Sequence, residues 1–340
     1  MATPAAFQLG SVQAKAGARG DGWIEVSRRA DGSVIGFPVV VLQGSEEGPV
    51  LLLDGCTHGD EVETTMAVHR VIERVDPKKL RGTLLAIPVV NVLAVDAMQR
   101  ITPTHVIDNP DINRVFPGAA DGSMTQRMAH VYTEQVISRA QFMITLHSAG
   151  LMHMGYGKEG MVIYDYEGGP VDEKSREMAK AFGCGLLSKN AHPGLVTSSS
   201  SVARQRGIPA ICPEIGGTDR LPDSLDHSIS LHVEGVLNVM RHLGMLNEPP
   251  KSRGSWVEFE GHPHVRTSRD GFVEAYPGIK LGSMVKKGQK VVAIRDFFGR
   301  EVETVTAPWD GVVTLLRTYS FAHGGDFVVE IGPNAREVTS

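Results

Sequence analysis

The segment VLLLDGCTHGDE, residues 50–61, changes abruptly from apolar to polar side chains. Its first half has the continuous apolar character of a strand that is buried on both faces. Its second half brings a histidine and two carboxylates to the carboxyl end of that strand, directly before a region of helical period. Open α/β sheets bind their ligands at such strand ends, so we expect residues 58–61 to belong to a functional site.

On both sides of this segment, short apolar runs alternate with stretches of helical period. This pattern predicts an α/β fold with helices on the faces of the sheet. Strands are expected at residues 39–42, 49–54, 83–90, 142–146 and 208–213. Helices are expected after residue 61, after Ser123 as an N-cap, and from near Asp223 to Gly244.

A polar, Pro-rich stretch at residues 247–254 ends the helical patterning. Beyond it, short strands alternate with glycine-containing turns, which is typical of an all-β unit. We therefore predict a first domain over residues 1–246, a linker over 247–253 and a smaller all-β domain over 254–340.

The composition limits the classes of function. The chain has 340 residues and a net charge of -5, whereas nucleic-acid-binding domains usually carry a basic surplus, so we expect small-molecule partners and no nucleic acid. No apolar stretch approaches the length that spans a bilayer, and the N-terminus lacks the features of a signal peptide. Three cysteines are too few for a disulfide framework. These features predict a cytoplasmic protein that does not act at a membrane.

His58 and Glu61 are spaced so that both side chains can reach one cation at the first turn of the expected helix. The same pair would also fit an ordinary helix N-terminus, where the helix dipole favours carboxylates. The candidate third ligand is His147, which follows the apolar run 142–146, although a histidine there can also be a hydrogen-bonded core residue. Two histidines and one carboxylate leave a fourth position open, which is typical of catalytic zinc. We predict one Zn²⁺ per chain at these three residues.

Other polar residues follow the same logic. Glu214 follows the expected strand 208–213 and precedes two glycines, so it is a candidate general base exposed to a cleft. Asn113 and Arg114 lie in the segment DINRVFPG, and an amide beside a guanidinium is suited to binding a substrate carboxylate. Arg100 lies shortly before this segment.

Taken in order, His58-x-x-Glu61, Asp111-x-Asn113-Arg114, His147 and Glu214-x-Gly216-Gly217 resemble the succinylglutamate desuccinylase/aspartoacylase family, which is related to the zinc carboxypeptidases. The resemblance covers most of residues 35–245. It implies a mixed central sheet flanked by helices, zinc at His58, Glu61 and His147, and Glu214 as general acid/base. It also implies that Asn113 and Arg114 hold a substrate carboxylate and that Arg100 polarises the scissile carbonyl.

The resemblance extends to the C-terminal region, which is similar to the family's lipoyl- or biotinyl-like second domain. The Met-Lys-Met of a biotin acceptor is absent, so Lys286 and Lys287 are interpreted as solvated turn residues. Family resemblance also makes a homo-oligomer an expectation.

These observations predict a zinc-dependent deacylase that cleaves the amide bond of a small N-acyl amino acid or related amide by attack of activated water. Two alternatives remain: a metallo-carboxypeptidase acting on peptides, and a non-catalytic module that binds a ligand or partner. Cys56, two residues before His58, would indicate a thiol hydrolase if it were reactive, but we interpret it as a small turn residue. His262 and His264 are interpreted as a surface loop, while His153, His192 and the serines at 198–201 are candidate pocket-lining residues.

Overall fold

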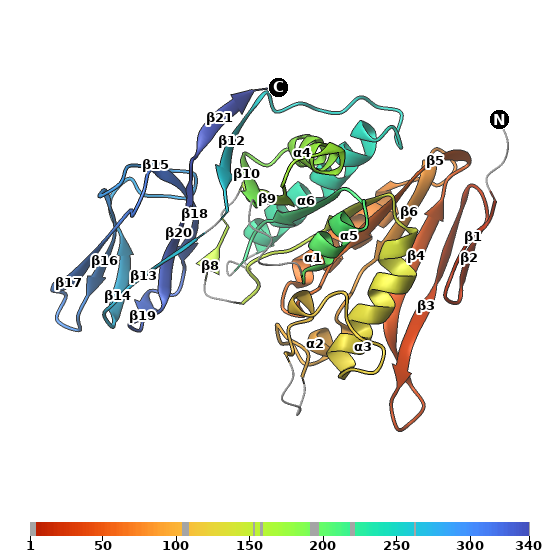
Figure 1. Cartoon of the computed structure of the whole chain (residues 1–340), viewed down its shortest axis with the longest axis horizontal. Helices are drawn as coiled ribbons and strands as arrows, with labels where there is room; N and C mark the ends of the chain where they lie inside the picture. The colour runs from red at the N-terminus through yellow and green to blue at the C-terminus, as the bar shows by residue number, and fades with distance from the viewer. Residues whose placement is uncertain are drawn as a thin grey trace.

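The computed structural model describes residues 5–103, 109–151, 154–156, 159–190, 197–217, 222–261 and 263–339. A ten-stranded mixed sheet with helices on its faces forms the larger part, and two smaller antiparallel sheets form the rest (Figure 1). This arrangement confirms the predicted α/β fold with a smaller C-terminal all-β part.

The large sheet is mixed: it contains two groups of parallel strands that meet at an antiparallel pair near its centre, and its edge strands pair antiparallel. In spatial order its strands are β21 (Arg336–Thr339), β12 (Ser255–Glu260), β10 (Leu186–Asn190), β9 (Met161–Asp165), β11 (Ala210–Glu214), β7 (Phe142–Thr145), β5 (Glu46–Asp54), β6 (Arg81–Ile87), β4 (Val34–Gln43) and β3 (Ala18–Arg28). Strand β5 pairs in parallel with β6 and β7, and β7 pairs in parallel with β11. The carboxyl ends of β5, β7 and β11 therefore lie side by side at one edge.

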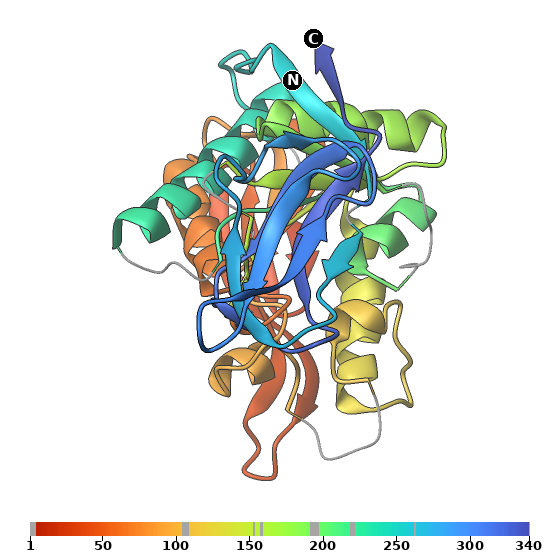
Figure 2. The same cartoon turned by 90° about the vertical axis from the view of Figure 1, so that its left-hand side faces the viewer.

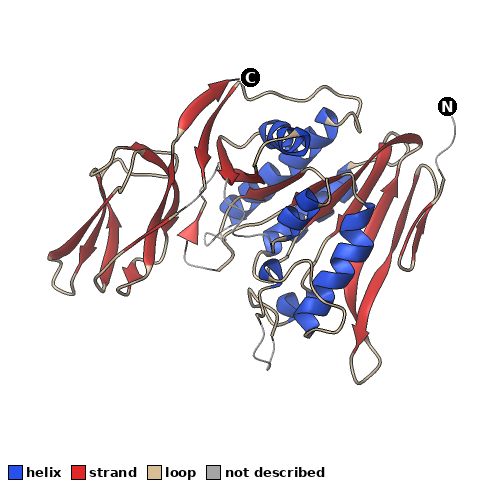
Figure 3. Ribbon diagram, in the orientation of Figure 1, coloured by secondary structure: helices blue, strands red, loops and turns tan. Residues whose placement is uncertain are grey.

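Helices cover both faces of this sheet (Figure 3). One face packs against α1 (Val62–Arg74), α4 (Pro170–Phe182) and α6 (Pro222–His242). The other packs against α3 (Met124–Val131), its continuations η2 (Tyr132–Val136) and η3 (Ile137–Arg139), and α5 (Ser199–Gln205). Two short helical segments, α2 (Val92–Asp96) and η1 (Ile112–Arg114), lie in connections near the strand ends.

Local sequence explains the helix boundaries. The side chain of Ser123 accepts a hydrogen bond from the backbone N–H of Gln126, and the side-chain oxygen of Gln126 accepts one from the backbone N–H of Ser123, so the expected N-cap forms a capping box. Gly244 has a φ of +69° after α6, a conformation that glycine adopts without steric cost. No helix in the described part of the chain is long and apolar enough to cross a membrane.

The smaller part consists of two antiparallel sheets around a separate apolar core. One contains β13 (His264–Arg266), β20 (Phe327–Pro333), β18 (Gly311–Arg317) and β15 (Met284–Val285), and the other contains β17 (Glu301–Thr306), β16 (Lys290–Arg295), β14 (Gly271–Ala275) and β19 (Phe321–Ala322). At the opposite end of the molecule, β1 (Phe7–Leu9) and β2 (Val12–Ala14) form a hairpin.

The two parts are joined by strand pairing as well as by the connection after α6 (Figure 1), and the smaller part faces the viewer in Figure 2. Strands β12 and β21 come from the C-terminal region but pair at the edge of the large sheet. In the other direction, β8 (Met154–Gly155) leaves the larger part and pairs with β18. The predicted domain division between residues 246 and 254 stays a prediction. Strands from each side of it pair with strands of the other part.

Candidate metal centre

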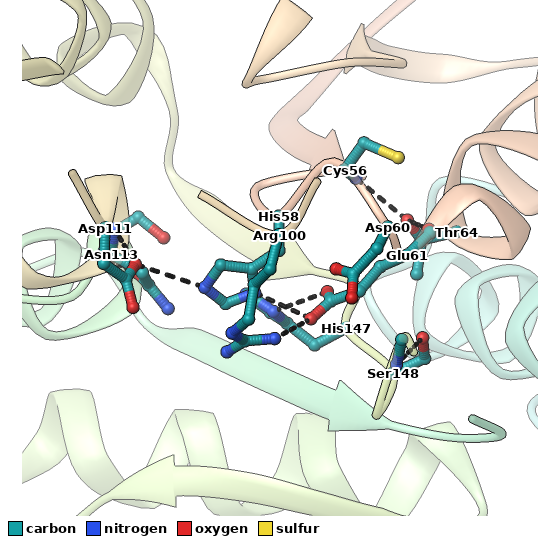
Figure 4. Close-up of polar contacts among 12 residues, drawn as sticks. Cys56, His58, Asp60, Glu61, Thr64, Arg100, Asp111, Asn113, His147 and Ser148 are labelled. Carbon is teal, nitrogen blue, oxygen red and sulfur yellow. Dashed lines mark hydrogen bonds and ion pairs between the residues drawn. The ribbon is translucent and has the colours of Figure 1, made fainter. Parts of the chain in front are cut away.

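His58 and Glu61 lie in the turn between β5 and α1. Glu61 is the residue immediately before the first helical residue, and both side chains are buried. The Nδ1 atom of His58 lies 2.7 Å from Oε1 of Glu61. The sharp break after the apolar strand thus places an imidazole and a carboxylate against each other inside the protein (Figure 4).

His147 reaches the same point from the neighbouring strand. It follows β7, and its Nδ1 atom lies 2.9 Å from Oε2 of Glu61. The ligand atoms of His58, Glu61 and His147 all lie within 4.8 Å of one another. The tertiary structure therefore brings together the three residues that the sequence proposed as metal ligands.

The turn that carries His58 is held by close backbone packing. Cys56 has a positive φ of 47°, and its N–H donates to Oγ1 of Thr64 at 2.8 Å. Gly59 lies so close to α2 that a Cβ there would be 2.2 Å from the carbonyl carbon of Ala94. Asp60 joins this turn to the loop after His147 by accepting a hydrogen bond from the N–H of Leu151 at 2.9 Å. These contacts fix the positions of both histidines.

Asp111 contacts the far side of the His58 ring, a role that the sequence analysis did not assign to it. Its Oδ1 lies 3.3 Å from Nε2 of His58. Burial alone would raise the pKa of Asp111, but the hydrogen bond and charge of His58 outweigh it and lower the pKa to about 2. With a cation bound, an ionised Asp111 would accept a hydrogen bond from Nε2–H of His58 and leave Nδ1 free as the metal ligand.

This donor set fits a metal ion. Each imidazole directs Nδ1 toward the Glu61 carboxylate, and the second nitrogen of His58 faces another carboxylate. Burial alone would raise the pKa of Glu61, but the charges of His58 and His147 hold it well below its usual range. Two imidazole nitrogens and one ionised carboxylate form a buried cluster of the kind that binds zinc.

Glu214, the last residue of β11, lies beside His147. The two residues are register partners in a parallel bridge, and their backbones are linked by the N–H of His147 donating to Pro213 O at 2.9 Å. Partners in register project to the same face of a sheet. Burial, followed by the negative charge of Glu61, raises the pKa of the Glu214 carboxyl well above its usual range.

Arg100, Asn113 and Arg114 lie around the same cluster. Arg100 donates from Nη1 to Oε1 of Glu61 at 2.9 Å, so its guanidinium lies at the metal site. Asn113 accepts a hydrogen bond on Oδ1 from the N–H of Ser199 at 3.1 Å, and Arg114 donates from Nη1 to the Asn113 carbonyl at 3.0 Å. The side-chain NH₂ group of Asn113 is thereby turned away from α5.

Tyr156 is a further residue near the site that the sequence analysis did not identify. Its N–H donates to Gly216 O at 3.3 Å, two residues after Glu214. Burial raises the pKa of its phenol well above the usual range, and the charges of Glu214 and Glu330 raise it further. The sequence around Tyr156 does not indicate that this residue lies near Glu214. The two residues come close because strand pairing joins segments that are far apart in the chain.

The remaining candidates divide into three groups. Cys56 is fully buried, and burial raises the pKa of its thiol to about 11, so it is protonated at neutral pH and does not fit a nucleophile. Ser198 caps α5 by accepting a hydrogen bond from Ser201 N at 3.1 Å. His153, His192 and His262 lie outside the described residues, whereas His264 begins strand β13 and does not lie in a surface loop as expected.

Comparisons with known proteins agree with this geometry. A model of the succinylglutamate desuccinylase/aspartoacylase catalytic domain matches residues 47–243. The N-alpha-acetyl-L-2,4-diaminobutyric acid deacetylase of Halomonas elongata is 26% identical over 302 residues, which cover 87% of this chain and 85% of that protein.

Two solved structures share the fold over nearly the whole chain. The product-bound ectoine utilization protein EutE (DoeB) of Ruegeria pomeroyi has a TM-score of 0.78 at 22% identity, with 93% of this chain and 95% of that chain covered. A succinylglutamate desuccinylase/aspartoacylase of Rhodobacter sphaeroides has a TM-score of 0.79 at 23% identity, with 95% and 96% covered. The chain therefore belongs to the succinylglutamate desuccinylase/aspartoacylase family of amidohydrolases, with His58, Glu61 and His147 as its metal-binding cluster.

Proposed function

We propose that the protein is a deacylase that uses one zinc ion per chain to hydrolyse the amide bond of a small N-acyl amino acid. The observation that carries this proposal is the buried convergence of His58, Glu61 and His147, with Glu214 in register beside His147. Zinc bound there would supply Lewis acidity, which activates water near neutral pH and polarises the scissile carbonyl.

Glu214 is the group that moves protons in this mechanism. A carboxylate at the end of β11 accepts a proton from the attacking water and then donates it to the departing amine. The buried setting that raises the pKa of Glu214 suits the second step, because it stabilises the protonated carboxyl until the amine leaves.

The basic residues orient the substrate and balance charge. Arg100, whose guanidinium contacts Glu61, would stabilise negative charge that develops on the carbonyl oxygen. Asn113 and Arg114 would hold the α-carboxylate of the N-acyl amino acid, since a guanidinium beside an amide offers several donors to one carboxylate. This anchoring contributes orientation of the scissile bond.

The test begins with zinc content. Protein purified without added metal and protein stripped with a chelator would be compared for bound zinc, and one zinc per chain is expected before stripping. Absence of zinc binding would favour the non-catalytic alternative and overturn the proposal.

The second part of the test measures released amine from N-acetyl and N-succinyl amino acids. Nα-acetyl-L-2,4-diaminobutyrate is included because the Halomonas elongata relative is named for that substrate. Zinc-dependent turnover of N-acyl amino acids is expected. Faster cleavage of C-terminal residues from peptides would instead identify a metallo-carboxypeptidase.

A further inference from the structure

Glu330 is a buried carboxylate on β20, in the smaller part of the protein. Its side chain is 3% exposed, and its partners are Nε2 of His264 at 2.7 Å and Oγ1 of Thr314 at 3.3 Å. Among the described residues, no lysine or arginine forms an ion pair with it. An ionised carboxylate that is buried without a cationic partner loses much of its hydration without full compensation.

Glu258 on β12 is a second buried carboxylate, and it has cationic partners. Its side chain is equally buried, but Arg176 lies 2.7 Å and Arg336 3.0 Å from its oxygens, and the hydroxyl of Tyr164 donates to it at 2.7 Å. Two guanidinium groups therefore neutralise Glu258. By contrast, the described partners of Glu330 are an imidazole and a hydroxyl, which leaves its carboxyl group open to pairing with a cation from outside the chain.

The strand geometry directs Glu330 toward the larger part of the protein. Its neighbours Val329 and Ile331 lie in the apolar core between the two small sheets, so Glu330 projects from the opposite face. Gly332 shares that face, and a Cβ at Gly332 would lie 2.1 Å from the ring of Phe259 on β12. The face that carries Glu330 is therefore the one that packs against the large sheet.

Strand pairing continues from Glu330 to the active site. Glu330 pairs with Leu315 on β18, and the next residue, Leu316, pairs with Gly155 on β8. Gly155 forms a bridge with Gly217, three residues after Glu214. Tyr156, beside Gly155, experiences the charges of both Glu214 and Glu330. Tyr156 is therefore close to both carboxylates.

The charges around Glu214 have two origins. Besides Glu61, the charged residues that act on Glu214 are Arg100 and Arg114 from the larger part of the protein and Glu330 from the smaller part. Arg100 and Arg114 supply positive charge for the α-carboxylate of a substrate, whereas Glu330 supplies negative charge contributed by a different sheet. A substrate that carries both an anionic and a cationic group is complementary to this arrangement.

We propose that Glu330 is a specificity-determining residue that binds the ammonium group of a cationic substrate side chain, which makes N-acyl diamino acids the preferred substrates. This inference rests on the proposed deacylase function and names the substrate class of the same site. His264 donates a hydrogen bond from Nε2 and positions the carboxylate, and Thr314 orients its second oxygen.

The test compares two substrates that differ only at the end of the side chain. Nα-acetyl-L-2,4-diaminobutyrate carries an ammonium group where N-acetyl-L-norvaline carries a methyl group. The ratio of their kcat/KM values is measured for zinc-loaded wild-type protein and for Glu330→Gln. The wild-type protein is expected to prefer the cationic substrate, and the substitution is expected to lower the ratio by roughly 10- to 100-fold, because a charge-assisted hydrogen bond is lost.

Two control variants separate recognition from structural damage. Glu258→Gln removes an equally buried carboxylate that has its own arginine partners, and it is expected to change both substrates by the same factor. His264→Ala keeps the Glu330 carboxylate but removes the hydrogen bond that positions it, so it is expected to lower the ratio by less than Glu330→Gln does. An unchanged ratio in Glu330→Gln, or a wild-type protein that prefers N-acetyl-L-norvaline, would overturn the assignment of Glu330.

Binding measurements keep this test independent of turnover. If wild-type protein hydrolyses neither compound nor any other N-acyl amino acid, the proposed function fails. Isothermal titration of the two unhydrolysed compounds then still tests Glu330. Tighter binding of the diaminobutyrate compound that is lost in Glu330→Gln would support the cation site, and equal binding of both compounds would refute it.

Discussion

Replacing Asp111 tests how the protein prepares His58 for a metal ion. Asp111 lies 3.3 Å from Nε2 of His58, and its Oδ1 also accepts a hydrogen bond from the N–H of Asn113 at 2.9 Å. An amide at this position keeps an acceptor oxygen but loses the negative charge, whereas alanine loses both. The two substitutions therefore separate charge from hydrogen bonding.

The expected loss follows from these contacts. Removing a carboxylate that orients a metal-bound histidine typically weakens metal binding by 10- to 100-fold, or about 1.4 to 2.8 kcal/mol. Asp111→Asn is expected near the lower limit, because the Asn oxygen can still accept from Nε2–H. Asp111→Ala is expected near the upper limit, because the ring also loses its acceptor and the 112–114 turn loses its cap.

Zinc affinity would be measured by competition with a fluorescent chelator, using metal-free protein at neutral pH. Asp226→Asn is the matched control, because Asp226 pairs with Arg70 at 2.7 Å on the surface and its side chain is 66% exposed. That control is expected to bind zinc as the wild-type protein does. Wild-type zinc affinity in both Asp111 variants would refute the orienting role of this carboxylate.

Three further predictions follow from the described contacts. Glu214→Gln is expected to retain zinc and to lower kcat by at least about 100-fold, since proton transfer is lost; near-normal kcat in a zinc-replete sample would remove Glu214 from the mechanism. Arg114→Lys is expected to raise KM for N-acyl amino acids through loss of bidentate binding, with little effect on the corresponding N-acyl amines that lack the carboxylate; equal effects on both substrates would contradict carboxylate binding. Burial raises the pKa of Asp54 to about 7 although Tyr132 donates to it at 2.6 Å, so its contribution to stability is present below pH ~4 and is lost as the pH rises through about 7. This pKa shift corresponds to roughly 4 kcal/mol. The free energy of unfolding of Asp54→Asn and of wild type would be measured by urea titration at pH 5 and pH 8, and the variant is expected to gain stability relative to wild type at pH 8. A difference between the two proteins that does not change with pH would show that Asp54 does not titrate in this range.

Periodicity in the sequence was sufficient for the elements that carry the site. The apolar runs before Asp54, His147 and Glu214 correspond to β5, β7 and β11, because strands buried on both faces need continuous apolar sequence. Ser123 and Gly244 mark helix ends through local hydrogen bonding and backbone conformation, which neighbouring residues determine. Such features depend on short-range chemistry and can be read directly.

The segment between β7 and α5 was harder to predict. Helix α4 buries Asp172 and Ser175 together with its apolar residues, so its apolar stripe is interrupted. Asp172 is tolerated inside because Arg204 of α5 lies 2.6 Å from it. A buried ion pair between distant elements weakens the amphipathic pattern of each element by itself.

The sequence by itself determined the fold class and proposed which residues could meet at a metal ion, because His58, Glu61, His147 and Glu214 each follow or end an apolar strand whose neighbours place them at one sheet edge. Only the tertiary structure decided that Asp111 contacts His58, that β8 crosses to β18, and that strand pairing connects Glu330 on β20 through β18 and β8 to Gly217, near Glu214. These contacts arise from pairings between segments far apart in the chain, and local periodicity carries no information about which distant strands will pair.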